Sequence, residues 1–73
     1  MPNIGDIITI SNDKKYVVAN LTNYSDSIYC YLVNLNNEDD TSIALYKETS
    51  FEIVNDESLI AELEEVFASN FGQ

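Results

Sequence analysis

The chain contains no histidine, arginine or tryptophan, and it has only one cysteine, one proline and two glycines among 73 residues. Without histidine, neither a Ser-His-Asp or Cys-His catalytic arrangement nor a Cys/His zinc site can be built from this chain. A single cysteine excludes an internal disulfide framework. Gly5 and Gly72 lie at opposite ends of the chain, so no glycine cluster is available to cradle a phosphate group. We therefore expect no enzyme activity, no cofactor and no bound metal.

Positive charge is also scarce, because three lysines stand against thirteen acidic residues and the formal net charge is −10. Direct binding to nucleic acid needs basic residues that neutralise phosphates, so this function is not expected. Apolar runs are only a few residues long, which predicts neither a signal peptide nor a membrane span. With 45% hydrophobic residues the chain is too apolar for a disordered acidic tail. These features predict one globular, cytoplasmic domain over residues 1–73.

The apolar pattern predicts five short strands followed by one helix. Runs of β-branched and aromatic residues place the strands at about residues 6–10, 15–20, 28–35, 41–47 and 51–54. Apolar residues then recur with helical spacing, which predicts an amphipathic helix over about residues 56–70. The short connections favour antiparallel pairing. The expected fold class is α+β: a small antiparallel five-stranded sheet, or an open SH3-like barrel, packed by one C-terminal amphipathic helix.

The ends of the helix carry the residues that usually begin and end one. Asn55 is expected to act as the N-cap, which lets Val54 pack against Leu59 one turn later. Phe71 extends the apolar stripe of the helix, and Gly72 is placed to close its C-terminus.

Cys30 is the one candidate nucleophile in the sequence. It lies in the middle of the strand predicted at residues 28–35, between Tyr29 and Tyr31, and no cationic residue is near it in sequence. A cysteine in such a place is usually a small buried hydrophobic residue with an inert thiol. We therefore expect Cys30 to belong to the core.

The acidic run at residues 38–40 is expected to lie in a charged turn over residues 36–40. Its carboxylates are of the kind that bind a hard cation, but the glycine and the final glutamate of an EF-hand loop are missing. The favoured interpretation is a solvated turn that keeps the edge of the sheet from pairing with other chains.

The excess of carboxylates suggests binding to a basic protein. Two acidic surfaces are expected, one on the helix and one in the charged turn, and their residues are Glu57, Glu62, Glu64 and Glu65, and Glu38, Asp39 and Asp40. Such a domain could occupy the basic groove of a nucleic-acid-binding protein in place of the phosphates, with strong dependence on salt. The alternative is that these acidic surfaces only keep the protein soluble.

A second hypothesis concerns the tyrosines. Tyr24 is expected in a polar loop over residues 21–27, and Tyr29 and Tyr31 alternate with apolar residues along the third strand. If Tyr29 and Tyr31 face away from the helix, they form an aromatic patch of the kind that supports self-association, so a homo-oligomeric scaffold or accessory module stays open. The third strand is apolar on both faces, however, which predicts that it is central and covered twice.

The sequence also resembles a group of small acidic proteins of low-GC Gram-positive bacteria and of their phages and conjugative elements. The resemblance rests on the opening segment from Pro2 to Ile8, the segment from Asp13 to Val18, the tyrosine-rich third strand and the acidic C-terminal helix. It implies a cytoplasmic protein of a mobile element, and it transfers no functional residue. The overall expectation is a non-enzymatic, acidic protein-binding domain that blocks a basic nucleic-acid-binding partner by charge mimicry.

Overall fold

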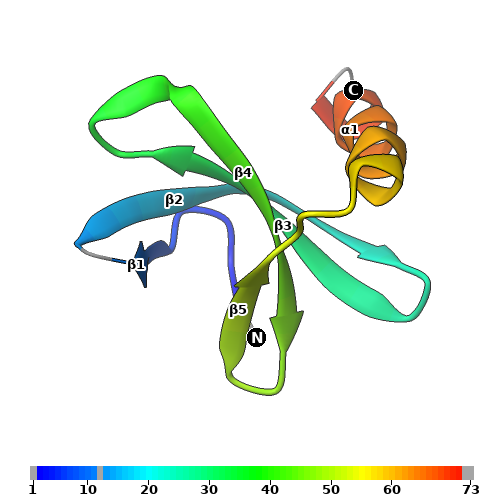
Figure 1. Cartoon of the computed structure of the whole chain (residues 1–73), viewed down its shortest axis with the longest axis horizontal. Helices are drawn as coiled ribbons and strands as arrows, with labels where there is room; N and C mark the ends of the chain where they lie inside the picture. The colour runs from blue at the N-terminus through cyan, green and yellow to red at the C-terminus, as the bar shows by residue number, and fades with distance from the viewer. Residues whose placement is uncertain (1, 12, 72–73) are drawn as a thin grey trace.

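A computed structural model describes residues 2–11 and 13–71 (Figure 1). Five strands precede one helix, and their bounds are β1 Ile7–Ser11, β2 Lys14–Tyr24, β3 Ser27–Asn34, β4 Asn37–Lys47, β5 Ser50–Ile53 and α1 Glu57–Phe71. The strands pair in the order β1-β2-β3-β4-β5, and every neighbouring pair is antiparallel. The sheet curls into a half-barrel, and α1 packs on one of its faces (Figure 1). The predicted α+β class is confirmed.

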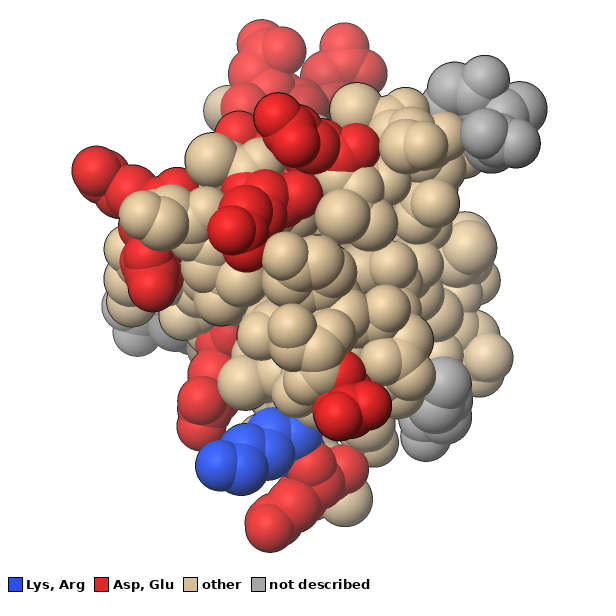
Figure 2. All heavy atoms as spheres, turned by 90° about the vertical axis from the view of Figure 1, so that its right-hand side faces the viewer, with Lys and Arg blue, Asp and Glu red and all other residues tan. Residues whose placement is uncertain are grey.

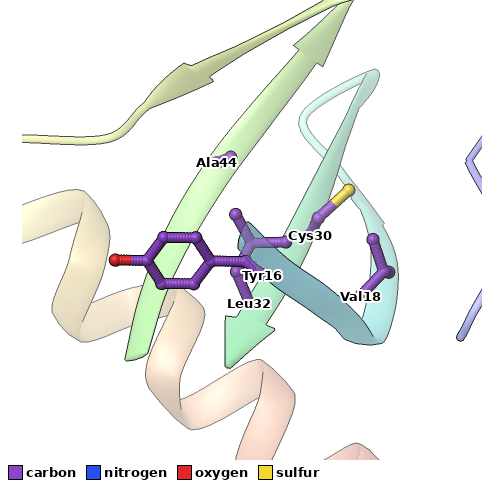
Figure 3. Packing of buried hydrophobic residues seen from close by; sticks show 5 residues of the cluster. All are labelled: Tyr16, Val18, Cys30, Leu32 and Ala44. Carbon is purple, nitrogen blue, oxygen red and sulfur yellow. The ribbon is translucent and has the colours of Figure 1, made fainter. Parts of the chain in front are cut away.

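The central strand β3 is covered on both faces, as its two-sided apolar pattern predicted. On one face, residues of β2, β3 and β4 form a buried group that we call the sheet cluster (Figure 3): Tyr16, Val18, Cys30, Leu32 and Ala44. On the other face the helix contributes to a second group, the helix cluster: Tyr29, Ile43, Leu63 and Phe67. Successive residues of a strand point to opposite faces, so β3 supplies both clusters.

A bulge in β2 decides which of its side chains reach which cluster. The register of β2 on β3 shifts between Val18 and Asn20, so Ala19 is an extra residue in the ladder. Val18 therefore belongs to the sheet cluster, whereas Tyr24, at an even spacing from it, packs against the helix cluster. Without the bulge both side chains would lie on one face, and the helix would lose a contact.

Two segments expected as connections are strand. Residues 21–27 were predicted to be a polar loop, but β2 continues to Tyr24 and pairs with β3 up to Tyr24↔Ser27. Only Ser25 and Asp26 form the turn, and both have positive φ, at 51° and 63°. This is the backbone that a tight two-residue hairpin requires, and it lets polar strand residues continue up to the turn.

The charged turn predicted over residues 36–40 is also wrong, because β4 begins at Asn37, which pairs with Asn34 of β3. Only Leu35 and Asn36 remain as the turn. The three acidic residues that follow, Glu38, Asp39 and Asp40, belong to β4. Their side chains remain accessible to solvent, so the strand does not bury their charges. The other strand bounds and the helix bounds differ from the predicted ones by at most one residue.

The helix begins one residue later than expected, because Asp56 caps it in place of Asn55. The Asp56 Oδ1 atom accepts hydrogen bonds from the backbone N–H groups of Ser58, at 3.0 Å, and Leu59, at 3.3 Å. These are the donors that an N-cap side chain satisfies. Val54 and Leu59, which were predicted to pack against each other, both pack against the helix cluster. The predicted closing residue Gly72, and the side chain of Phe71, lie outside the described part of the structure.

Candidate functional site

The thiol of Cys30 is enclosed in the sheet cluster and has no exposed surface (Figure 3). Burial raises its pKa to about 11, because an apolar environment disfavours the charged thiolate. The thiolate is the nucleophilic form of cysteine, so this side chain is both inaccessible and in the wrong protonation state for covalent chemistry near neutral pH.

The acidic run of β4 does not assemble a cation site. Glu38 and Asp39 are exposed, whereas the half-buried Asp40 has its carboxylate bonded to Tyr16 and Asn34. Within residues 2–11 and 13–71, no group of three or more potential metal-ligating side chains comes together.

Asp40 serves as a hydrogen-bond acceptor within the fold. Its Oδ2 atom accepts from the Tyr16 hydroxyl at 2.9 Å and from the Asn34 side-chain amide at 3.0 Å. The bond from Asn34 and then the bond from Tyr16 hold the pKa of Asp40 below its ordinary value, and the positive charge of Lys14 adds to this effect. The bond to Asp40 in turn raises the pKa of Tyr16. Asp40 therefore links β2, β3 and β4, and its carboxylate is already used within the sheet.

The helix glutamates form an acidic surface over α1. Glu57, Glu64 and Glu65 are exposed, and α1 contains no lysine or arginine that could neutralise them. Figure 2 shows acidic side chains over the upper and left parts of this face and at its lower edge, where the one basic side chain in view also lies. We call Glu57, Glu64 and Glu65 the helix acids.

Glu62 is placed differently from the helix acids, although it is also exposed. Its Oε2 atom accepts a hydrogen bond from the Tyr24 hydroxyl at 2.8 Å, which joins the end of β2 to α1. This bond raises the pKa of Tyr24. Glu62 thus helps to hold the helix on the sheet.

The three tyrosines of the self-association hypothesis do not form an open patch. Tyr29 is 8% exposed and packs in the helix cluster, and Tyr24 and Tyr31 lie half-buried against that cluster. The Tyr24 and Tyr29 rings meet edge to face with their centroids 6.4 Å apart, and the Tyr31 ring lies 5.6 Å from that of Phe67. The condition of that hypothesis, that Tyr29 and Tyr31 face away from the helix, is therefore not met.

A groove between α1 and the sheet was not expected from the sequence. Its volume is about 280 Å³, and its lining includes Thr41, Ile43, Val54, Ile60 and Glu64. Glu64, one of the helix acids, lies at this groove, and Thr41, the residue after the acidic run of β4, lines it as well. It arises because β4 has 11 residues and β5 only four, a difference that no local sequence pattern reveals.

Comparison with known proteins adds no assignment, since no family model, curated protein or solved structure matches this chain at a significant level. In the part of the chain that the structure describes, no helix combines the length and apolar character needed to cross a membrane.

Proposed function

We propose that this protein is a non-catalytic binding domain that attaches to a basic protein through the helix acids and the groove beside them. The observation that carries the proposal is the exposure of Glu57, Glu64 and Glu65 on a helix without a single basic residue. A surface of one charge sign attracts a partner of the opposite sign over long range and speeds their encounter.

In the finer form of this proposal the basic partner handles nucleic acid, and the domain competes with the phosphate backbone for it. Two observations support this form: the net charge of −10, and the position of Glu64, one of the helix acids, at the groove. A partner that binds phosphates offers clustered lysine and arginine, which is the surface that carboxylates complement. An origin in a mobile element stays a prediction from the resemblance. Self-association through the tyrosines has no comparable support, because the helix covers them.

The test is a competition assay at two salt concentrations. Basic proteins captured from cytoplasm on the immobilised domain are purified, loaded with a labelled DNA duplex and titrated with the free domain. We expect displacement of the duplex at low salt and a steep loss of displacement at high salt. If the duplex is not displaced at low salt, the partner is not one that competes with nucleic acid. If the captured proteins bind the domain equally at both salt concentrations, the charge-based proposal as a whole is contradicted.

A matched pair of variants separates the site from the overall charge. Glu57→Gln, Glu64→Gln and Glu65→Gln remove three charges from the helix, whereas Asp13→Asn, Asp26→Asn and Glu48→Asn remove three charges from turns. The turn residues have positive φ, which asparagine tolerates, so the control variant keeps its backbone. Only the helix variant should lose binding. Equal loss in both would mean that net charge, and no particular surface, governs the interaction.

A further inference from the structure

The edge of β4 beyond the end of β5 is bare. β5 pairs with β4 from Lys47↔Ser50 to Ala44↔Ile53, and Val54 adds one more bond by donating its N–H to the Ile43 carbonyl at 2.9 Å. The chain then turns away into α1, and in the described residues no strand pairs with the outer edge of β4 over residues 37–42. Figure 1 shows β4 continuing past the end of β5, and lining residues of the groove come from both β4 and α1.

The bond from Val54 shows which backbone groups face this bare edge. In an antiparallel strand the N–H and C=O of one residue point to the same side, and successive residues alternate between the two sides. Because the Ile43 carbonyl points toward β5, the backbone groups of Thr41 point to the same outer side; beyond Thr41 the register of β4 on β3 shifts, so the regular edge ends there. The Asp39 N–H is already taken by the Asn37 side chain at 3.1 Å. The N–H and C=O of Thr41 therefore form the central donor and acceptor of the open edge.

We propose that an extended, basic segment of the partner adds to the sheet as a short strand at the outer edge of β4 beside Thr41, with a lysine or arginine side chain opposite Thr41 lying in the groove. This proposal rests on the proposed function and names the form of the partner. A residue paired with Thr41 exchanges both backbone hydrogen bonds with it. Strand addition of this kind gives affinity through the main chain and selectivity through side-chain pockets.

The groove fits a long basic side chain. Ile43, Val54 and Ile60 provide an apolar wall for the alkyl part, and the Glu64 carboxylate lies at the same groove for the charged end. The volume of about 280 Å³ is below the roughly 300–1,000 Å³ of small-molecule pockets. The groove also lies near the N-terminus of α1, but Asp56 and Glu57 more than offset the partial positive charge of about half an elementary charge at that end.

The charges along the edge argue for a basic strand and against a second copy of this chain. An exposed edge is a template for any extended chain, and natural proteins often guard edges with charged side chains. Here Glu38, Asp39 and Asp40 follow the edge, so another copy would bring like charges opposite them. A strand carrying lysine or arginine would meet opposite charges instead. The edge therefore repels acidic strands and attracts basic ones.

The probe for this site is a short peptide of alternating lysine and valine, titrated into the full chain and followed by amide chemical shifts. We expect shifts at residues 39–43 and around Glu64. A peptide with its central amide nitrogen methylated keeps the charge but cannot donate to Thr41, and its affinity should fall about tenfold. The same peptide with glutamate in place of lysine should not bind.

A variant pair tests the same bond from the protein side. Thr41→Pro removes the N–H that points to the open edge. Because the backbone N–H and C=O of Thr41 point away from β3, the hydrogen bonds between β3 and β4 stay intact. Thr41→Val keeps the N–H. Peptide affinity should fall about tenfold in Thr41→Pro and stay within about twofold of the parent protein in Thr41→Val. If Thr41→Pro does not fold, the methylated peptide with the unaltered protein decides the question alone.

The outcomes separate this inference from the proposed function. If the lysine–valine peptide and its methylated form bind equally, and only Glu57→Gln, Glu64→Gln and Glu65→Gln weaken their binding, strand addition is overturned while the acidic binding surface stands. If neither the lysine–valine peptide nor its methylated form binds at low salt, strand addition and the acidic binding surface both fail. Shifts confined to β1, or association of the domain with itself, overturn the assignment of the β4 edge.

Discussion

The two faces of β3 are covered in different ways. One face is covered by strands that are hydrogen-bonded to one another, and the other is covered by a helix that no ladder joins to the sheet. The sheet cluster is enclosed by strands that are linked through hydrogen-bonded ladders, and side chains from β1 and β5 also pack against it. The helix cluster depends on α1, which is held by its apolar side chains and by the Tyr24–Glu62 bond. Loss of α1 leaves every ladder in place, so we infer that α1 can open locally while the sheet persists.

The largest expected effect comes from truncating one leucine in each cluster. Leu32 and Leu63 are both fully buried, in the sheet cluster and in the helix cluster respectively. Leu32→Ala should lower the free energy of unfolding of the whole protein by about 2–5 kcal/mol. That is a large part of the roughly 4–11 kcal/mol expected for a chain of this size.

Leu63→Ala removes a side chain of the same size, but its effect should be concentrated in α1. Amide hydrogen exchange measured by NMR checks the difference: in Leu32→Ala protection should fall in β3 and α1 together, whereas in Leu63→Ala it should fall in α1 and largely persist in β3. Equal loss of protection in both variants would show that helix and sheet unfold as one unit.

A smaller effect is expected at the start of α1. Asp56→Ala removes the side chain that accepts from the N–H groups of Ser58 and Leu59, so it should cost about 1 kcal/mol and raise exchange in the first turn. Asn55→Ala is the matched control, because no side-chain hydrogen bond from Asn55 to the helix is found in the described residues, and its effect should be within about 0.5 kcal/mol of zero. Thermal unfolding of the two variants measures this difference. The reverse result would restore Asn55 as the cap.

These elements also show what local patterns can and cannot predict. Five strands and a helix were predictable because period-2 and helical apolar patterns follow from which side chains must be buried. The polar ends of β2 and β4 were missed because their strands are held by pairing with β3, which a polar sequence does not signal. The face of β3 on which the tyrosines lie stayed open, because the sequence does not state which face the helix covers.

The candidate site was only half predictable, for a related reason. The helix acids follow directly from composition and helical spacing, and the structure finds them exposed. The groove and the bare edge of β4 depend on where β5 ends relative to β4, at Ala44↔Ile53. That is a matter of register between segments, which no single strand encodes. Asp40 was counted with the binding residues because its hydrogen bonds come from Tyr16 and Asn34, six and more residues away.

The smallest expected effect distinguishes the two tyrosine–carboxylate bonds, of which one lies within the sheet and the other joins the helix to it. Tyr16→Phe removes one of the two donors to Asp40, so the pKa of Asp40 should rise toward its ordinary value; Tyr24→Phe, the control, should leave it unchanged. A folded-state pKa below the unfolded one means that the carboxylate contributes stability above the unfolded pKa, near 4, and loses that contribution as the pH falls through the folded value. The stability difference between the parent protein and Tyr16→Phe should therefore be full at neutral pH and shrink below about pH 4.

Titration of the Asp40 carboxyl by NMR, with unfolding measured across the same pH range, checks the pKa shift and the pH dependence of stability. An Asp40 pKa that shifts equally in both variants would mean that the bond from Tyr16 does not hold it down.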